Sequence, residues 1–402
     1  MTVYGTRPEA IKVAPVIKAL EASPDFTGVA VSTGQHREML DQVNEIFSIS
    51  PHTDLDIFAH GQGPSSIMAN ILEKLNPVLK ATKPDAVLVQ GDTSTSTAAA
   101  LAAFYHQVPV VHLEAGLRSG NIESPFPEEA NRKITTQISK LHLAPTAESR
   151  ANLVRENVDP STICITGNTV IDALLNVVEQ KAQFDDRALE EITASGRPIL
   201  LTTSHRRENW GKPMEGVGRA LRRLAEANPN YTIVLPVHRN PLVRDALLPN
   251  VEGLENVLVT EPLEYGQFAR LLSLSRIVLT DSGGVQEEAP SLGKPVLVMR
   301  ENTERPEAVT AGTVKLIGTD EQRIVDEVSS LINDSVQYEQ MANAVNPYGD
   351  GKAAERTLAA IRQMLGMGDR LPDFEPAEAA QSLESEFASV MKDSSTLADT
   401  TR

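Results

Sequence analysis

The sequence predicts an α/β protein built from two doubly wound, Rossmann-like units that face a shared cleft. Short β-branched apolar runs alternate with amphipathic stretches along most of the 402 residues, which is the pattern of parallel sheets covered by helices on both faces. The pattern restarts after a charged helical stretch at about residues 177–191. The length suits two domains of ordinary size. Because ligands of such folds bind at the carboxyl ends of the strands, we expect the site between the two units.

The first unit is predicted to cover residues 1–167. A helix is expected over residues 8–20, because Val13, Val16, Ile17 and Leu20 fall at helical spacing. The strands of this unit are predicted as short apolar runs at residues 3–4, 29–32, 86–90, 108–113 and 163–166.

The second unit is predicted to cover residues 168–350. Its strands are expected at residues 199–203, 232–236, 257–260, 277–280 and 296–299. The segment 370–402 is acidic, rich in Ala, Ser and Glu, and poor in large apolar residues, so we expect it to lack fixed structure. The alternative there is a weak amphipathic helix that carries Leu383, Phe387, Val390 and Met391.

Composition excludes several classes of function. The formal net charge of −17 argues against nonspecific binding to nucleic acid or to anionic membranes. No apolar run approaches the length of a membrane span and no secretory leader opens the chain, so a cytoplasmic location is expected. The single cysteine, Cys164, excludes an intrachain disulfide and a cysteine-rich metal site. The chain lacks a strand-anchored dinucleotide fingerprint and a P-loop, and we expect no cofactor and no metal.

A phosphate-binding turn is predicted at Ser282-Gly283-Gly284. This turn follows a buried strand and opens a helix, so backbone N–H groups and the positive end of the helix dipole are available to an anion. Glu288, about one turn into that helix, is placed to accept hydrogen bonds from ribose hydroxyls. For this turn alone, a glycine-rich loop with a surface acid is the alternative.

Cationic groups follow several other strands of the predicted sheets. Arg7 and Lys12 belong to a helix start after the first strand, and the planar guanidinium of Arg7 suits a diphosphate or a sugar. His205 and Arg305 follow strands of the second unit and could contact a phosphate or a hydroxyl. In isolation, each of these residues could instead be structural or simply solvated.

Carboxylates occur in three successive loops of the first unit: Asp92, Glu114 and Glu128. A single carboxylate in such a loop could merely cap a helix. Three of them converge in space if the sheet is parallel. Crowding and desolvation then give pKa values suited to acid–base chemistry.

Taken together, the motifs resemble those of the bacterial non-hydrolysing UDP-N-acetylglucosamine 2-epimerase family, in family order and as far as about Leu365. The matching segments are GTRPEAIK from Gly5, QHREMLDQV from Gln35, QGDTST from Gln90, HLEAGLRSG from His112, PEEANR from Pro127, ITGNTVIDALL from Ile165, SHRREN from Ser204, PVHRNP from Pro236, TDSGGVQEEAPSLGKPVLV from Thr280, TERPEAVTAGT from Thr303 and NPYGDG from Asn346. This chain departs from the family at Leu263, where Gln is frequent, and at Gln90, where His is frequent.

The resemblance implies a GT-B-like pair of domains, with UDP held mainly by the second and a helix at 351–366 completing the first. It implies interconversion of UDP-N-acetylglucosamine and UDP-N-acetylmannosamine without metal or nicotinamide, through elimination of UDP and re-addition to a 2-acetamidoglucal. The product would supply N-acetylmannosamine units for cell-surface polysaccharide. The residues carried over to acid–base catalysis are Asp92, Glu114, Glu128 and His205. Those carried over to substrate binding are Arg7, Lys12, Asp92, Glu114, His205, Phe268, Ser282, Gly283, Gly284, Glu288 and Arg305.

The resemblance also implies a homodimer and, in some members, a second UDP-N-acetylglucosamine molecule that is needed for activity. The residues that match this second site are Gln35, Gln62, Glu128, Arg206 and His238. Three other readings remain open: a glycosyltransferase of the same architecture, a hydrolysing epimerase that releases N-acetylmannosamine, and a catalytically silent UDP-sugar sensor.

Overall fold

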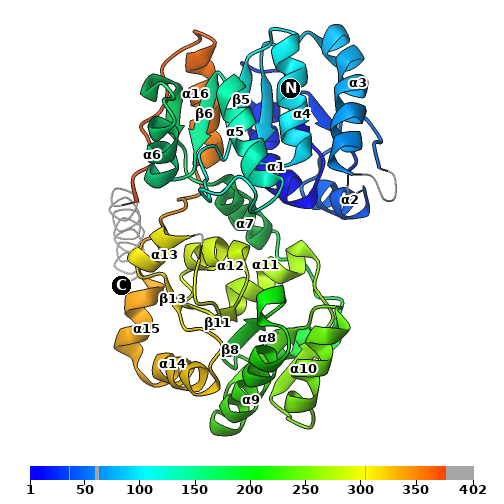
Figure 1. The fold of residues 1–402 in the computed structure, drawn as a ribbon. Helices are drawn as coiled ribbons and strands as arrows, with labels where there is room; N and C mark the ends of the chain where they lie inside the picture. The colour runs from blue at the N-terminus through cyan, green and yellow to red at the C-terminus, as the bar shows by residue number, and fades with distance from the viewer. Residues whose placement is uncertain (36, 59–62, 304, 377–402) are drawn as a thin grey trace, which may run out of the picture.

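Two parallel sheets, one above the other, form the two lobes of the molecule in the computed structural model (Figure 1). The structure describes residues 1–376 apart from 36, 59–62 and 304. The expectations for Gln62 and for the segment from residue 377 onward fall outside these described residues. No helix within them is long and apolar enough to cross a membrane.

The first sheet has seven strands in the order β3-β2-β1-β4-β5-β6-β7, and the strands are all parallel. The strands are β1 (Thr2–Tyr4), β2 (Ala30–Ser32), β3 (Thr53–Asp54), β4 (Val87–Gln90), β5 (Val110–Leu113), β6 (Leu141–Ala144) and β7 (Ile163–Ile165). The helices of this lobe are α1 (Arg7–Ala22), α2 (Arg37–Ile46), α3 (Pro64–Thr82), α4 (Ser94–Tyr105), α5 (Glu128–Ile138) and α6 (Ala147–Arg155).

The second sheet has six parallel strands in the order β10-β9-β8-β11-β12-β13. The strands are β8 (Ile199–Thr203), β9 (Thr232–Pro236), β10 (Val257–Thr260), β11 (Ile277–Thr280), β12 (Val296–Val298) and β13 (Val314–Leu316). Its helices are α8 (Arg187–Ala194), α9 (Lys212–Ala227), α10 (Pro241–Val251), α11 (Tyr265–Leu274), α12 (Gly283–Glu288), α13 (Pro306–Thr310), α14 (Glu321–Asn333) and α15 (Ser335–Ala342).

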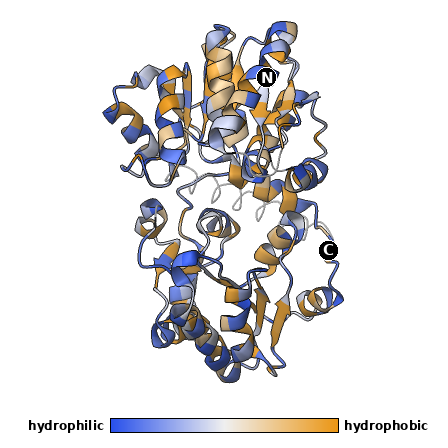
Figure 2. Ribbon diagram, turned by 45° about the vertical axis from the view of Figure 1, so that its right-hand side comes forward, coloured by the Kyte–Doolittle hydropathy of each residue, from blue (hydrophilic) through white to orange (hydrophobic). Residues whose placement is uncertain are grey.

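The hydropathy of the chain explains the layers. Most of the strands are apolar, whereas many of the helices carry one apolar and one polar face (Figure 2). A strand buried on both faces needs apolar residues throughout, and a covering helix needs them on one stripe only. The predicted fold class, two Rossmann-like α/β units, is confirmed.

The predicted helical stretch at residues 177–191 is two helices and not one. Helix α7 (Thr169–Glu179) ends before a loop, and α8 begins at Arg187 after Asp186, whose carboxylate accepts a hydrogen bond from the Ala188 N–H at 2.8 Å. The strands that the sequence did not predict, β3, β6 and β13, are short and carry polar or charged residues.

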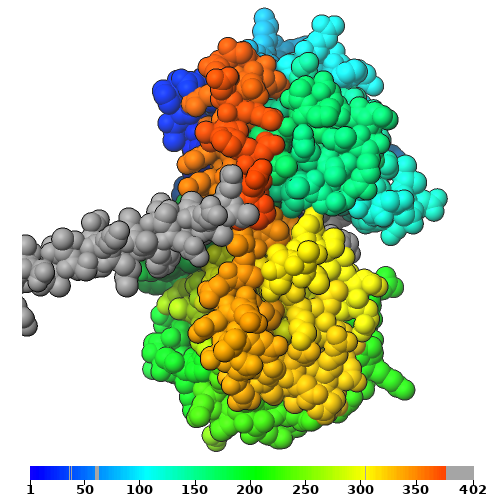
Figure 3. All heavy atoms as spheres, turned by 90° about the vertical axis from the view of Figure 1, so that its left-hand side faces the viewer, coloured from blue at the N-terminus to red at the C-terminus, as the bar shows by residue number. Residues whose placement is uncertain are grey.

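The two lobes are joined by two crossing segments, near Gly167 and near Gly349. After the first crossing, α7 lies between the sheets and contacts both α1 and α11 (Figure 1). After the second, α16 (Ala353–Met364) returns to pack against α1, and Figure 3 shows it on the outside of the upper lobe. The Arg362 side chain of α16 pairs with Asp25 at 2.5 Å.

The crossing segments lie against each other. Gly167 has a φ of +80°, and a Cβ atom there would lie 3.3 Å from the Gly349 Cα. The Asn168 N–H donates to the Tyr348 carbonyl at 2.6 Å. The two covalent connections between the lobes therefore lie side by side.

Candidate active site

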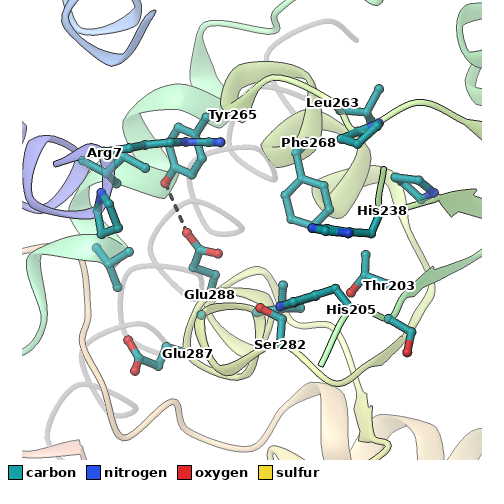
Figure 4. Close-up of a pocket in the computed structure, with 18 of the residues that line it drawn as sticks. Arg7, Thr203, His205, His238, Leu263, Tyr265, Phe268, Ser282, Glu287 and Glu288 are labelled. Atoms are coloured by element: carbon teal, nitrogen blue, oxygen red, sulfur yellow. Dashed lines mark hydrogen bonds between the residues drawn. The ribbon is translucent and has the colours of Figure 1, made fainter. Parts of the chain in front are cut away.

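A cavity of about 640 Å³ lies in the cleft between the lobes. Residues of α1 line one side of it, and the loops at the carboxyl ends of the second sheet line the other. Figure 4 shows Arg7 and Tyr265 on one side and His205, His238 and Phe268 on the other. A cavity of this size suits a ligand as large as a nucleotide sugar.

The predicted phosphate-binding turn forms part of the cavity wall. Ser282 and Gly284 line the cavity, and α12 begins at Gly283. Gly283 has a packing reason to lack a side chain, because a Cβ atom would lie 2.7 Å from a terminal nitrogen of Arg305. At Gly284 the nearest atom to an added Cβ would be a Glu288 carboxylate oxygen at 3.9 Å, so this glycine leaves the backbone open to the cleft.

Asp281 organises the loops beside that turn, although it was not singled out from the sequence. Its buried carboxylate accepts hydrogen bonds from the Ser204 hydroxyl at 2.9 Å, the Asn209 amide at 3.1 Å and the Arg206 N–H at 3.0 Å. The His205 N–H donates to it at 3.0 Å, and the His205 Nδ1 lies 3.3 Å from it. Burial lowers the pKa of the His205 imidazole, while the charge of Asp281 opposes that shift. One carboxylate thus fixes the loop that presents His205 to the cavity.

Glu288 is buried in the cavity wall, and its carboxyl group has a pKa close to neutral pH. The Tyr265 hydroxyl donates to its carboxylate at 3.2 Å. Burial, followed by the charge of Glu287, raises the pKa of Glu288 to about 7. Arg7 extends across Tyr265 (Figure 4) and forms no hydrogen bond or ion pair within the described part of the chain. A cation and an acid with spare bonding capacity therefore face the same space.

Glu114 lies behind Lys12 and not on the cavity surface. Its carboxylate accepts hydrogen bonds from Lys12 and Gln90 and, at 3.1 Å, from the Asn168 side chain. Burial opposes ionisation, but the charge and hydrogen bond of Lys12 outweigh it and lower the pKa of Glu114. Glu114 also has a φ of +61°, which is strained for a residue with a side chain. Lys12 itself lines the cavity.

Asp92 and Glu128 do not line this cavity. Asp92 pairs with Arg132 at 2.5 Å, and the Asn131 side chain donates to the Asp92 carbonyl at 2.9 Å. Glu128 begins α5, and one of its carboxylate oxygens is buried without a hydrogen-bond partner among the described residues. The Asp92 loop nevertheless adjoins Glu114, because a Cβ atom on Gly91 would lie 3.6 Å from the Glu114 carboxylate.

Arg305 and Glu287 complete a chain of contacts across the cleft. Arg305 donates from Nε to Glu287 at 2.6 Å, and the Asn168 side chain donates to the other oxygen of Glu287 at 3.1 Å. Lys12, Glu114, Asn168, Glu287 and Arg305 therefore form one network. Lys12, Glu287 and Arg305 of this network line the cavity. Asn168 and Glu287 were not singled out from the sequence.

The residues matched to a second site are divided between the lobes. His238 lines the cavity and stacks on His205, with ring centroids 6.0 Å apart. Arg206 lies in the same loop as His205, and its buried Nε has no partner among the described residues. Gln35 lies in the other lobe and accepts a hydrogen bond from the Thr95 hydroxyl at 2.9 Å. The part of the chain that the structure describes contains no group of three or more His, Cys, Asp or Glu that could hold a metal.

Fold and site together define a class of protein: a GT-B-like α/β protein whose interdomain cleft presents cations, a glycine turn and a buried acid to a phosphorylated ligand. A family model described as UDP-N-acetylglucosamine 2-epimerase matches residues 18–362. The UDP-N-acetylglucosamine 2-epimerase of Escherichia coli K12 is 52% identical over 368 residues, which cover 90% of this chain and 98% of that relative.

Solved structures agree. The UDP-N-acetylglucosamine 2-epimerase of Neisseria meningitidis, bound to UDP-N-acetylglucosamine, has a TM-score of 0.79 and 46% identity, and the match covers 90% of this chain and 99% of that one. The enzyme of Methanocaldococcus jannaschii, in complex with UDP-N-acetylglucosamine and UDP, has a TM-score of 0.71 and 32% identity, with 91% and 99% covered. This chain belongs to the UDP-N-acetylglucosamine 2-epimerase family, and the predicted family is confirmed.

Proposed function

We propose that this protein interconverts UDP-N-acetylglucosamine and UDP-N-acetylmannosamine by inverting carbon 2 of the sugar. The observation that carries the proposal is one cavity that brings the Ser282–Gly284 turn and Glu288 together with Lys12, whose ammonium group pairs with Glu114. It offers a nucleotide-diphosphate site on one lobe and, on the other, a cation whose carboxylate partner lies directly behind the cavity wall. The bound ligands of the Neisseria and Methanocaldococcus relatives support the same substrate.

The reaction proceeds by elimination, because no carbonyl at an adjacent carbon stabilises a carbanion at carbon 2. A base takes the carbon 2 proton, a double bond forms between carbons 1 and 2, and the bond from carbon 1 to the diphosphate oxygen breaks. Re-addition of UDP to the 2-acetamidoglucal, with protonation of carbon 2 from the opposite face, gives the epimer. Arg7, His205 and the Ser282–Gly284 amides stabilise the departing charge, while Phe268 lines the nucleotide side of the cavity.

The acid–base groups of this proposal are Asp92, Glu114, Glu128 and His205. Asp92 and Glu114 are each paired with a cation in the present arrangement, so proton transfer requires one of these pairs to open. Lys12 lines the cavity, and a bound diphosphate competes with Glu114 for its ammonium group. Loss of that partner raises the pKa of Glu114 and makes it a stronger base when substrate is present.

Incubation of the purified protein with UDP-N-acetylglucosamine in deuterated water tests this function. We expect deuterium at carbon 2 and recovery of both UDP-sugars. Free N-acetylmannosamine would indicate a hydrolysing epimerase, and sugar transfer to an added acceptor would indicate a glycosyltransferase. Tight binding with intact, undeuterated substrate would indicate a sensor. Each of these three results contradicts the proposal.

The proposal extends to regulation and assembly. Arg206 and His238 adjoin the His205 side of the cavity, which supports a second UDP-N-acetylglucosamine molecule there, with Gln35 and Glu128 of the other lobe as further candidate contacts. UDP-N-acetylmannosamine alone then turns over slowly until traces of UDP-N-acetylglucosamine are added. Equal initial rates with and without these traces exclude the second site.

We also propose a homodimer that supplies N-acetylmannosamine units for cell-surface polysaccharide. Light scattering coupled to size exclusion tests the assembly, because the chain mass is 43.5 kDa and a dimer has twice that value. Deletion of the gene followed by sugar analysis of the surface polysaccharide tests the pathway.

A further inference from the structure

Asn168 occupies the point where the chain passes from the first lobe to the second. It precedes α7, and its side-chain oxygen accepts a hydrogen bond from the Val170 N–H at 3.1 Å, which caps that helix. Its backbone N–H donates to Tyr348 of the other crossing segment. The residue is only 4% exposed. Asn168 is therefore almost fully buried.

Both N–H groups of the Asn168 amide face carboxylates, and the two carboxylates belong to different lobes. One is Glu114, which follows β5, and the other is Glu287 of α12; each lies 3.1 Å from the Asn168 Nδ2. A side-chain amide has only two N–H groups and here both are committed. Each carboxylate also contacts one cation, Lys12 for Glu114 and Arg305 for Glu287.

The arrangement places a neutral donor between two negative charges. Hydrogen bonds to ionised acceptors are stronger and more directional than those between neutral groups. Because Asn168 bonds to the same Glu114 oxygen as Lys12, it holds that oxygen when Lys12 moves toward a ligand. The second hydrogen bond of Asn168, to Glu287, links the orientation of the Glu114 carboxylate to α12, the helix that begins at the glycine turn.

We propose that Asn168 is a positioning residue that holds the Glu114 carboxylate in one orientation and links it to Glu287, so that the acid–base group and the phosphate-binding helix keep a fixed relation. This inference rests on the proposed function, in which Glu114 takes part in proton transfer at carbon 2. It assigns to Asn168 a role in the chemical step and not in the affinity for UDP.

The alternative is that Asn168 serves only to cap α7. Substitutions can separate this structural role from the positioning of Glu114. Asn168→Ser keeps a side-chain oxygen for the Val170 N–H but removes both donors to the carboxylates. Asn168→Asp keeps the shape and the cap and replaces the donors with a third carboxylate. Asp186→Ser is the matched control, because Asp186 caps α8 in the same way and does not line the cavity.

The experiment measures kcat and KM for UDP-N-acetylglucosamine and the Kd for UDP by calorimetry, for the unsubstituted protein and all three variants. We expect kcat to fall on the order of tenfold in Asn168→Ser and further in Asn168→Asp, with KM and the UDP Kd changed by less than about threefold. Asp186→Ser should match the unsubstituted protein in all three constants.

Unchanged kcat in Asn168→Ser overturns the inference, as does an equal loss of kcat in Asp186→Ser. If Asn168→Ser does not fold, the nearly isosteric Asn168→Asp decides: loss of kcat with UDP binding retained supports the inference, and retained kcat overturns it. Absence of epimerisation by the unsubstituted protein is a separate result, because it contradicts the proposed function and not the role of Asn168.

Discussion

Glu288 is the residue whose titration is easiest to measure, because its environment moves its pKa from 4.5 to about 7. A buried acid with a raised pKa binds its proton more tightly in the folded state than in the unfolded state. The stability that this provides is fully present below pH 4.5 and is lost as the pH rises through about 7. A shift of this size corresponds to roughly 3 kcal/mol at most.

The Glu288→Gln variant should lose that pH dependence. We expect its free energy of unfolding, relative to the unsubstituted protein, to increase between pH 5 and pH 8, because the amide carries no charge to bury. Denaturant unfolding at the two pH values provides the measurement, and the UDP Kd should weaken in parallel. An identical pH dependence in both proteins would show that Glu288 titrates normally.

The Lys12–Glu114 pair should behave as a single unit in stability. The Glu114 side chain is 8% exposed and that of Lys12 19%. Removal of one partner leaves a buried charge without its counterion, which typically costs about 3–5 kcal/mol. We expect Lys12→Met and Glu114→Gln each to destabilise the fold, and the double variant to be more stable than the sum of the two losses predicts.

A double-mutant cycle by urea unfolding measures this coupling, which should be roughly 1–3 kcal/mol. Lys18→Met with Glu21→Gln is a suitable control cycle, because this pair on the same helix is exposed and should show coupling below about 0.5 kcal/mol. Additive losses at Lys12 and Glu114 would contradict the structure.

Site residues could be predicted from the sequence only where the residues that act together are close to one another in the chain. The glycine turn and Glu288 lie within one short segment, so their local pattern suggested a site. Asn168 and Asp281 could not be found in that way, because Asn168 bonds to residues 54 and 119 positions away and Asp281 to residues more than 70 positions away. The catalytic assignment of Asp92, Glu114 and Glu128 stays a prediction.

Among the elements, α1 connects two of the loops that carry candidate site residues. The buried Glu9 side chain accepts hydrogen bonds from the Gly5 and Thr6 N–H groups at 3.0 and 2.8 Å and from the Thr93 hydroxyl at 2.6 Å. It thereby joins the turn that presents Arg7 to the loop that carries Asp92. The spacing of Thr6 and Glu9 is that of a capping box, but only the structure shows the contact with Thr93.

Glu9→Ala should therefore lower stability and activity together. We expect a loss of about 2 kcal/mol or more, since three donors lose a buried acceptor, and a fall in kcat/KM of about tenfold or more because both loops loosen. Glu21→Ala on the same helix is exposed and should change stability by less than about 0.5 kcal/mol. Thermal unfolding and steady-state kinetics check both variants, and similar effects at the two positions would count against a linking role for Glu9.

Element prediction succeeded for strands that are mainly apolar and β-branched. Strands β9 and β11 are runs of this kind and were predicted with the bounds that the structure shows. β3 has only two residues, β6 contains His142 and β13 contains Lys315, so their strand signal is weak. These segments become strands because they pair with neighbouring strands, and this pairing between distant residues cannot be read from a local sequence pattern.

For the molecule as a whole, the contact between Gly167 and Gly349 joins the two crossing segments, and we predict that it takes part when the lobes close on a ligand. A Cβ atom on Gly167 would meet the other crossing segment at 3.3 Å, whereas one on Gly196 would meet nothing within 4 Å. Both glycines have left-handed backbones, with φ of +80° and +73°. A side chain at either position would therefore meet the same backbone strain, but only one at Gly167 would also contact the other crossing segment.

Gly167→Ala and Gly196→Ala should each cost about 1 kcal/mol of stability from the backbone alone. We predict that UDP compacts the molecule and that only Gly167→Ala reduces this compaction, because its methyl group separates the crossing segments. Small-angle scattering with and without UDP measures the compaction. Equal compaction in both variants would show that this contact plays no part in closure.

One core cluster contains residues of both lobes, among them Leu113 of β5, Leu174 of α7 and Leu201 of β8. Helix α7 thus continues one side of the interior of the upper lobe into the lower one, while the other face of each sheet packs into a cluster of its own lobe. Differential scanning calorimetry should consequently record a single endotherm, with equal calorimetric and van't Hoff enthalpies. Because this cluster is shared, unfolding of one lobe exposes apolar residues of the other.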